Sequence, residues 1–405
     1  TNPNLRSFCL SLYVRAGSIF EDSSNNGISH LFEHVVFRNI KNKYENFYEL
    51  LAMHGLCFQG STYKKFVSFT IDGPQHEFDF AIEILCGLFD EIKLTSHDFN
   101  NEKGRIKAEI REKDRRSSLD FYFDSIVWKN SEVEKIVLGY CKTVDRVSVK
   151  KINEFRQKVL SAGNCFVYAT GNISDENLDA LNKKISELDI SQSNPGFTNT
   201  VTVNDEFFHR EKKIWIKNNY WHYIQIGFDV DCSKYPGGVY DLLYALLFNG
   251  DKALVYNYLS EDNPIIYSYD SAFAQYDNVG NINFSFEVDR NKIEDVFKTV
   301  VELLNAAKDG RFNFEANLNY EMFNWELDLD KPSNLNWNMA CYNHILKTEP
   351  IDYSDEFYGR FRVTKKQVTD AAKDIFRRCN MTVAMKGNKK KINTDAIEKI
   401  LESLD

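Results

Sequence analysis

An internal repeat is the feature that most constrains the fold of this 405-residue chain. The segment 145–172, DRVSVKKINEFRQKVLSAGNCFVYATGN, aligns with 361–388, FRVTKKQVTDAAKDIFRRCNMTVAMKGN, at an offset of 216 residues. At this offset Asn164 pairs with Asn380, and the apolar segment SFCLSLYV falls on YIQIGFDV at 223–230. Both apolar segments have the pattern of a buried strand. Self-similarity at one fixed offset indicates a duplicated domain.

The pattern of the first copy predicts strands mixed with helices. Strands are expected over 8–14 and 164–173, and a strand, a turn and a second strand over 57–72. Helices are expected in the segment that contains HLFEH and over 45–54, 76–92, 95–116, 119–137 and 149–160. A stretch rich in Ser, Asn, Thr, Pro and Gly then predicts a linker. We therefore expect a first domain over 1–190, a linker over 191–205 and a second domain over 206–405.

Composition argues against several classes of function. The net charge is −9 and the pI is about 5.5, so no surface for nucleic acid or an anionic membrane is expected. The longest apolar segments, such as 240–248, are shorter than the roughly 20 residues that a membrane-spanning helix needs, and we expect no secretory signal. The eight cysteines are scattered singly without a CxxC pair. This usage predicts reduced thiols and a cytoplasmic location.

The pentapeptide HLFEH at 30–34 is the strongest candidate for chemistry. In a helix, His30 and His34 lie one turn apart on one face, where a single metal ion can bind both imidazoles. Catalytic zinc takes about three protein ligands and keeps one open position, so a third ligand must come from elsewhere. Glu33, on the same flank, is placed to act as a general base toward water. For the motif alone, a buried amphipathic helix with two hydrogen-bonded histidines is the alternative.

HxxEH is the zinc-binding HExxH motif in reverse order, the inverzincin signature. The segment GISHLFEHVVF at 27–37 resembles the pitrilysin, insulin-degrading enzyme and mitochondrial processing peptidase family of zinc metallopeptidases, in which a glycine precedes the motif and a phenylalanine follows it. The resemblance covers nearly all of the chain. It implies an α+β fold of two homologous domains, each a mixed sheet backed by helices, which form a clamshell around a peptide-binding cavity.

The same resemblance implies that the third zinc ligand is a glutamate some 75 residues after the second histidine, with another glutamate seven residues before it. Glu109 lies 75 residues after His34, Glu102 lies seven before Glu109, and the pattern ExxxIxxEIxxxD closes at Asp114. Glu112 is the alternative ligand, but it lies among charged residues, whereas isoleucines flank Glu109 on a buried side. Glu102 would then orient a ligand or water without binding the metal. Taken alone, the segment would predict only a solvated, charge-rich helix.

The second copy of the repeat has lost the motif. At the 216-residue offset, the positions of the two histidines and of Glu33 are occupied by Leu246, Gly250 and Asn249. The first half is therefore the one that can bind zinc, and one Zn²⁺ per chain is expected. Because the second copy keeps the fold without the ligands, the fold does not itself require HLFEH.

The resemblance implies peptide-bond hydrolysis, with Glu33 as the group that activates water and later protonates the leaving amine. It also implies that substrate binds as an added edge strand through main-chain hydrogen bonds. The matching residues are Gln59, Gly60, Ser61 and Thr62. Small residues at 60 and 61 would allow close approach of a peptide backbone. An ordinary hairpin turn is the alternative for this segment.

Two departures from the family pattern bear on partners. The strand that opens the family's first domain has no counterpart in this sequence. A trimmed N-terminus would explain the difference. Active relatives also supply an Arg and Tyr pair to the substrate from the second half, but no arginine occurs here between Arg210 and Arg290. We therefore predict a heterodimer in which a homologous subunit without zinc completes the substrate site. A homodimer is the alternative assembly.

These observations predict a zinc metalloendopeptidase that hydrolyses oligopeptides or a peptide precursor, as the catalytic subunit of a two-subunit peptidase. A non-catalytic scaffold or interaction subunit of the same fold, which binds peptides without cleaving them, is the first alternative. The intact motif together with Glu102 and Glu109 favours catalysis over that alternative. An unrelated metal hydrolase is the second alternative, which the duplication disfavours.

Overall fold

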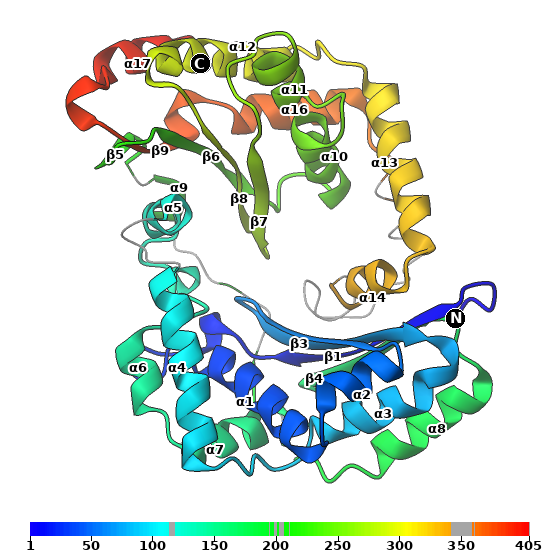
Figure 1. The fold of residues 1–405 in the computed structure, drawn as a ribbon. Helices are drawn as coiled ribbons and strands as arrows, with labels where there is room; N and C mark the ends of the chain where they lie inside the picture. Colours follow the sequence, from blue (N-terminus) through cyan, green and yellow to red (C-terminus); the bar gives the residue numbers. More distant parts are fainter. Residues whose placement is uncertain are drawn as a thin grey trace. The chain divides into compact units, whose positions relative to one another are not determined.

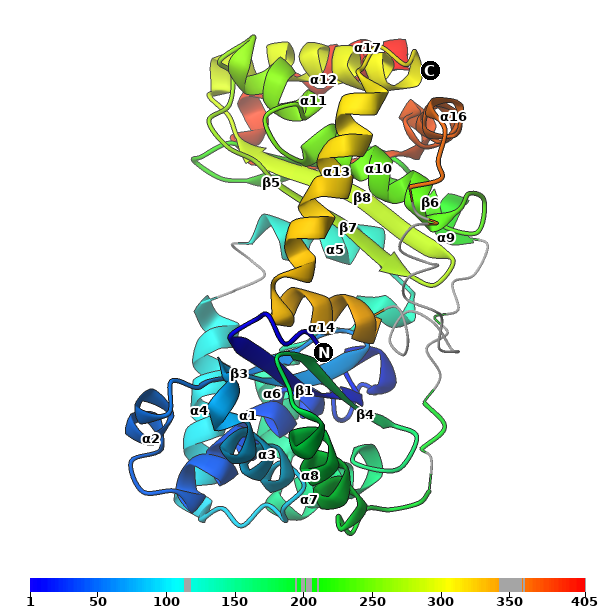
Figure 2. The same cartoon turned by 90° about the vertical axis from the view of Figure 1, so that its right-hand side faces the viewer.

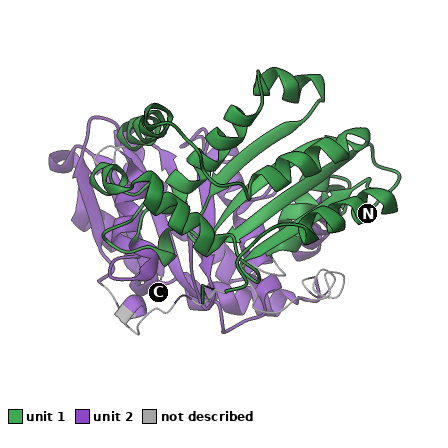
Figure 3. Cartoon of the chain, turned by 90° about the horizontal axis from the view of Figure 1, so that it is seen from below, with its two compact units in different colours: residues 1–114, 135–199, 326–353 green, residues 115–134, 200–325, 354–405 purple. Residues whose placement is uncertain are grey.

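The structure, a computed structural model, describes residues 1–112, 118–193, 195–197, 201, 206–209, 211–341, 359 and 361–404. The chain divides into two compact units (Figure 3). The first comprises Thr1–Asp114, Lys135–Asn199 and Glu326–Tyr353, and the second comprises Arg115–Glu134, Thr200–Trp325 and Ser354–Asp405. Each unit therefore contains a segment from the other half of the sequence.

Among the described residues, the first unit contains the strands β1 (Ser7–Arg15), β2 (Cys57–Thr62), β3 (Phe66–Pro74) and β4 (Cys165–Gly171). They form one antiparallel sheet in the order β2-β3-β1-β4. Alternate residues of β1, such as Leu10 and Leu12, belong to the apolar core of the unit. The core therefore lies between this sheet and the helices on one of its faces.

Helices of the first unit cover that apolar face (Figure 1). The helix that carries HLFEH is α1 (Ile28–Lys43), which packs against β2 and against α4 (Ser96–Glu112). α3 (Phe78–Gly87) packs on β1 and β3, and α7 (Val149–Val159) packs on α1. The remaining helical segments of the unit are α2 (Phe47–Met53), α6 (Cys141–Arg146), α8 (Asp175–Ser186), η1 (Ser18–Phe20) and η2 (Gln75–Glu77).

In the described part of the second unit, the strands are β5 (Ile214–Asn218), β6 (Tyr223–Asp231), β7 (Asp270–Tyr276), β8 (Val279–Glu287) and β9 (Met381–Gly387). They form a mixed sheet in the order β5-β9-β6-β8-β7, in which β5 is parallel to β9 and the other pairs are antiparallel. The helices that line its apolar core are α10 (Gly237–Phe248), α12 (Ile293–Lys308), α16 (Lys365–Ile375) and α17 (Thr394–Leu401).

The other helical segments assigned to the second unit complete the element list. They are α5 (Leu119–Val127), η3 (Glu132–Glu134), α9 (Glu206–His209), α11 (Leu254–Tyr256), η4 (Asn257–Glu261), η5 (Arg290–Lys292), η7 (Arg378–Asn380), η8 (Lys389–Lys391) and η9 (Glu402–Leu404). The boundary between the units falls within α13 (Phe314–Leu329).

The predicted duplication is confirmed element by element. At the 216-residue offset the bounds of β1 become those of β6, the bounds of β4 become those of β9, and the bounds of α7 become those of α16. The predictions of an α+β fold and of two homologous halves are therefore both confirmed. The predicted helix over 119–137 was too long: α5 ends at Val127, and Asn130 adopts a left-handed backbone with φ of 64°.

On the first sheet, the face opposite α1 is covered by α14 (Pro332–Ala340), a helix from the second half of the sequence (Figures 1 and 2). Asn336 is fully buried there and accepts a hydrogen bond from the Tyr13 hydroxyl at 3.0 Å. Its amide nitrogen donates to the backbone carbonyls of Cys9 and Tyr168. This face carries aromatic side chains, such as Tyr13 and Phe66, beside polar groups, and α14 packs on the former and forms hydrogen bonds with the latter.

The second sheet is covered in the reciprocal way by α5, a helix from the first half of the sequence, which packs on β6 and β9. Phe123 of α5 lies against Gly227, where no larger residue would fit. At the 216-residue offset α5 falls on 335–343, which overlaps α14. The two halves have therefore exchanged equivalent helices, so the compact units differ from the continuous segments 1–190 and 206–405 at these two places.

The described residues also bear on the state of the cysteines and on membrane-spanning helices. All eight cysteines are free thiols. Burial raises the pKa of several of them, including Cys165, whose pKa is about 12, so these thiols are not poised for nucleophilic chemistry. No helix in the described ranges is both long and apolar enough to cross a membrane.

Candidate metal centre

The position of the HLFEH helix is fixed at its N-terminus by Glu21. Its buried carboxylate accepts hydrogen bonds from the backbone N–H groups of Gly27 at 2.7 Å and Ser29 at 2.8 Å, and from the side chain of Asn26. These amides are among the donors that the first turn of a helix leaves without partners. Burial raises the pKa of Glu21, and the hydrogen bonds oppose that shift. The first motif histidine therefore lies in the first turn of a firmly capped helix.

Three predicted ligands converge on one point between α1 and α4. The rings of His30 and His34 lie edge to face with centroids 4.7 Å apart. Oε2 of Glu109, from α4, lies 3.6 Å from Nε2 of His30. One ligand atom from each of the three residues lies within 4.8 Å of the others. In the part of the chain that the structure describes, this is the one group of three or more His, Cys, Asp or Glu residues with that property.

The donor set fits zinc. Two imidazoles and one carboxylate with an open fourth position are a known ligand set for catalytic zinc. Ligand atoms bound at about 2 Å in a tetrahedron stand about 3.4 Å from one another. The 3.6 Å separation between His30 and Glu109 therefore needs little adjustment to bind the ion. Glu112, the alternative ligand, is exposed on α4 and is not part of the group. Asp114 lies outside the described residues.

Glu102 lies behind the ligands and does not join them. Its side chain is 3% exposed, and Oε2 lies 3.5 Å from Nδ1 of His34. A carboxylate beside one ring nitrogen fixes the ring's orientation and directs the other nitrogen toward the metal position. This position is the one expected of a residue that orients His34, and the role of Glu102 stays a prediction.

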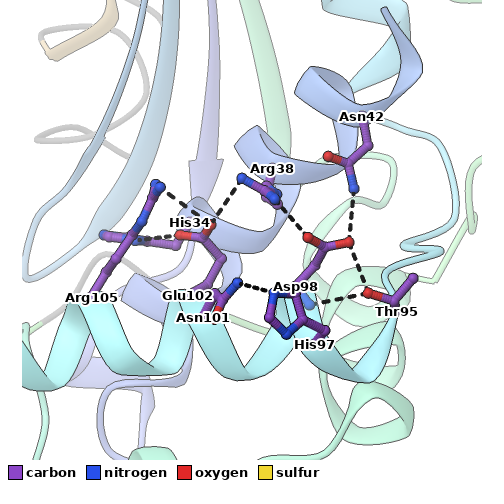
Figure 4. A network of polar contacts seen from close by, with 9 residues as sticks. All are labelled: His34, Arg38, Asn42, Thr95, His97, Asp98, Asn101, Glu102 and Arg105. Atoms are coloured by element: carbon purple, nitrogen blue, oxygen red, sulfur yellow. Dashed lines mark hydrogen bonds and ion pairs between the residues drawn. The ribbon is translucent and has the colours of Figure 1, made fainter.

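A network of charged side chains surrounds Glu102 (Figure 4). The guanidinium of Arg38 lies 4.0 Å from Oε1 of Glu102 and donates a 2.6 Å hydrogen bond to Asp98. Asp98 also accepts hydrogen bonds from Thr95 and Asn42, and the hydrogen bond from Arg38 holds the pKa of this carboxyl below its usual range. Arg105 approaches the same Oε1 atom of Glu102 at 3.5 Å. Two guanidinium groups and two carboxylates therefore form one network beside His34.

Glu33, the predicted base, lies between the motif helix and β2. The Thr62 hydroxyl donates a 2.7 Å hydrogen bond to Oε2 of Glu33. A Cβ atom at Gly60 would stand 2.9 Å from Cγ and from Oε1 of Glu33, so the absence of a side chain there makes room for the carboxylate. Burial raises the pKa of Glu33, while the hydrogen bond from Thr62 lowers it. A carboxyl group held in this way is suited to accept a proton and to return it.

The four predicted substrate residues lie on an edge strand. Gln59, Gly60, Ser61 and Thr62 are part of β2, and the turn to β3 follows at Tyr63, whose backbone N–H donates to Phe66 at 2.8 Å. β2 pairs with β3 on one side, and no other described strand pairs with its free edge. The segment is therefore strand rather than turn, and it runs past Glu33.

Sequence reasoning missed the residues that support this centre from a distance. Glu21, Arg38, Asp98 and Arg105 had no assigned role, because each acts through a contact that only the packed helices create. One signal was available: Arg38 follows His34 by four residues and so lies on the same face of α1.

Comparisons with known sequences agree with this geometry. A family profile described as "Insulinase (Peptidase family M16)" matches residues 1–139, and one described as "Peptidase M16 inactive domain" matches residues 146–316. The "Uncharacterized zinc protease YmxG" of Bacillus subtilis is 21% identical over 76% of this chain and 75% of its own length. The human "Mitochondrial-processing peptidase subunit beta" is 23% identical over 42% of this chain and 36% of its own length. The mouse "Cytochrome b-c1 complex subunit 1, mitochondrial" is 21% identical over 50% of this chain and 44% of its own.

Solved structures show the same fold. "The crystal structure of a protease from Helicobacter pylori" has a TM-score of 0.81 at 17% identity and covers 96% of this chain and 95% of that protein. A "peptidase M16 inactive domain from Pseudomonas fluorescens" has a TM-score of 0.79 at 14% identity and covers 95% of this chain and 93% of that protein. At these identities the likeness establishes the architecture, and the chemistry must be argued from the site.

Proposed function

The chain belongs to the insulinase (M16) family of peptidases, and on that premise we propose that it is a zinc-dependent endopeptidase that cleaves oligopeptides or a peptide precursor. One observation carries the proposal: His30, His34 and Glu109 bring their ligand atoms together, with Glu33 beside them. Two histidines and a carboxylate next to a possible general base are the parts that metal-assisted hydrolysis requires.

We assign His30, His34 and Glu109 as the residues that hold the ion. When bound, zinc would supply a Lewis acid that polarises a carbonyl group and makes water more acidic. Glu33 takes a proton from the attacking water and gives it to the leaving amine. Thr62 holds one oxygen of Glu33 by its hydrogen bond, so the carboxylate keeps one orientation through both proton transfers. Glu102 orients His34 in the same fixed way.

The substrate is proposed to bind along the free edge of β2. An edge strand presents backbone N–H and C=O groups to which an extended peptide can add as a further strand. Gly60 and Ser61 allow the two backbones to approach, and Gly60 lies directly beside Glu33. A peptide bond held there in extended form would lie next to the proposed base.

A non-catalytic binding subunit is the second candidate function. Two observations favour it: the second half has lost the motif, and the mouse relative is named as a subunit of the cytochrome b-c1 complex. The complete set of ligands and the adjacent Glu33 favour catalysis instead. The human relative named as subunit beta of a processing peptidase supports a partner, which we propose is a homologous subunit without zinc. A cytoplasmic location remains a prediction.

The test is metal content and peptide cleavage for the wild type and for Glu33→Gln. We expect one zinc per chain in both proteins, measured by elemental analysis, and cleavage of a mixed peptide library by the wild type alone. A chelator should abolish the cleavage. Zinc without cleavage in the wild type would support an incomplete or non-catalytic subunit. Absence of zinc from both proteins would overturn the proposal.

A further inference from the structure

Two arginines meet at one carboxylate oxygen beside the metal centre. Arg38 of α1 lies 4.0 Å from Oε1 of Glu102, and Arg105 of α4 lies 3.5 Å from the same atom (Figure 4). The Glu102 side chain is 3% exposed and contacts His34 through its other oxygen. With Asp98, which accepts a 2.6 Å hydrogen bond from Arg38, the cluster holds two arginines and two carboxylates.

The two arginines differ in how fully they are engaged. Arg38 is 19% exposed and is held by the 2.6 Å hydrogen bond to Asp98, which is itself held by Thr95 and Asn42. Arg105 is 59% exposed, and its contact with Glu102 is the one ion pair that the described residues offer it. A guanidinium carries five N–H donors in a fixed fork. Arg38 is therefore engaged mainly by Asp98, whereas the largely exposed Arg105 has donors left to bind a further group.

Arg105 also lies one helical turn from Glu109, one of the proposed ligands. It precedes Glu109 by four residues on α4, so the two side chains emerge on the same face of the helix one turn apart. Glu109 is itself 31% exposed. A substrate whose reacting bond lay beside His30, His34 and Glu109 would therefore pass within reach of the Arg105 guanidinium.

We propose that Arg105 is a specificity-determining residue that binds a substrate carboxylate close to the scissile bond. The inference rests on the proposed peptidase function and names its substrate class: peptides with a carboxylate there, supplied either by an Asp or Glu side chain or by the C-terminus. A planar guanidinium matches a carboxylate with two parallel hydrogen bonds, which are stronger than bonds between neutral groups. The second half offers no arginine between Arg210 and Arg290, and Arg105 would be a cation that this chain itself supplies to the substrate.

The competing explanation is a purely local one. Glu102 and Arg105 are three residues apart on one helix, and exposed pairs at that spacing contribute little. On that explanation Arg105 would affect helix stability slightly and would not discriminate between substrates. The two explanations predict different results for peptide binding, which can be measured without cleavage.

The experiment measures peptide binding to the full chain carrying Glu33→Gln, which removes the proposed base. The probes are fluorescein-labelled peptides of glycine, serine and leucine in matched pairs: Asp against Asn at each internal position in turn, and a free against an amidated C-terminus. Fluorescence anisotropy should give about tenfold tighter binding of one acidic peptide than of its neutral partner. The pair that shows the difference identifies whether the carboxylate comes from a side chain or from the C-terminus.

Substitutions then assign that preference to one side chain. Added to Glu33→Gln, Arg105→Gln should remove the tenfold difference by weakening the acidic peptide alone, and Arg105→Lys should restore part of it. Arg111→Gln is the matched control, because Arg111 is exposed on the same helix but faces away from Glu109. In the chain with Glu33 intact, Arg105→Gln should raise KM for the acidic peptide about tenfold more than it raises KM for the neutral one.

Two outcomes would overturn the inference. Equal binding of every acidic and neutral pair would show that the site does not select a carboxylate. A preference that survives Arg105→Gln would assign it to another group. Neither outcome touches the proposed function, which fails instead if the wild type holds no zinc.

Discussion

At the scale of single residues, the orientation of Glu33 depends on two neighbours in β2. Thr62 donates a hydrogen bond to one oxygen, and Gly60 leaves space for the other. A base that transfers a proton must keep within hydrogen-bond reach of it, and a displacement of about 1 Å can cost two orders of magnitude in rate. The small residue at position 60 therefore belongs to the proposed catalytic arrangement.

Replacing Gly60 by alanine tests this point. The added methyl group would stand 2.9 Å from Glu33 and push the carboxylate aside, so we expect cleavage to fall by about ten- to hundredfold with zinc content unchanged. Gly104→Ala on α4 is the matched control, because no atom lies within 4 Å of the added methyl group. That control should keep full activity and gain about 0.5–1 kcal/mol of stability, since alanine favours a helix over glycine. Equal activity of the two variants would contradict the role of Gly60.

The residues that could be predicted from sequence are those whose chemistry lies within one helical turn. The spacing of His30, Glu33 and His34 is enough to place them on one flank of a helix. Glu109 required a resemblance, since its distance along the chain has no physical meaning until α1 and α4 pack. Arg38 and Asp98 could not be paired at all, because their 2.6 Å contact joins segments 60 residues apart.

At the scale of elements, the metal centre depends on where α1 begins. Glu21 accepts hydrogen bonds from two backbone amides of the first turn, and Gly27 adopts a φ of 96° that other residues rarely take. The capping carboxylate is buried, which raises its pKa above the ordinary value for a glutamate. A raised pKa links the stability of this helix start to pH.

The sign of that link follows from proton binding. Between the ordinary pKa and the raised one, the folded chain keeps a proton on Glu21 that the unfolded chain releases, so stability falls as pH rises through this window. We expect the free energy of unfolding of the wild type, relative to Glu21→Gln, to decrease as the pH is raised from about 4 to about 7. Urea denaturation at several pH values measures the difference. A constant difference, or one that grows with pH, would show that the pKa of Glu21 is not raised.

Periodicity sufficed to predict most of the elements that surround the site. β1 is buried along its length as predicted, β3 and β4 lie where strands were expected, and α7 and α16 follow from the same repeat. The extents of two helices were wrong: α3 ends at Gly87 instead of 92, and α5 ends at Val127, shortly before a left-handed turn at Asn130. A local turn of this kind leaves little trace in hydrophobic periodicity.

At the scale of the whole molecule, the duplication is not a simple tandem arrangement. The helix α14, from the second half, covers one face of the first sheet, and α5, from the first half, covers the second sheet. No sequence pattern predicts such an exchange, because either helix would satisfy its own sheet equally well by amphipathicity. The exchange implies that neither half of the sequence contains a complete hydrophobic and hydrogen-bonded unit.

Separate expression of the halves tests this implication. The fragment 1–190 lacks Asn336, which bonds the Tyr13 hydroxyl and two backbone carbonyls, and it lacks Ala340, which packs on Tyr13 and Phe66. Losing each of these hydrogen bonds costs about 0.5–1.5 kcal/mol, and without α14 the apolar surfaces of Tyr13 and Phe66 become exposed to water, so we expect the fragment to lose its cooperative urea transition. A synthetic peptide spanning 326–341 should restore the transition, whereas the same peptide with Asn336→Ala should not. A fragment that unfolds cooperatively at the midpoint of the full chain, without the peptide, would show that α14 is dispensable to the first unit.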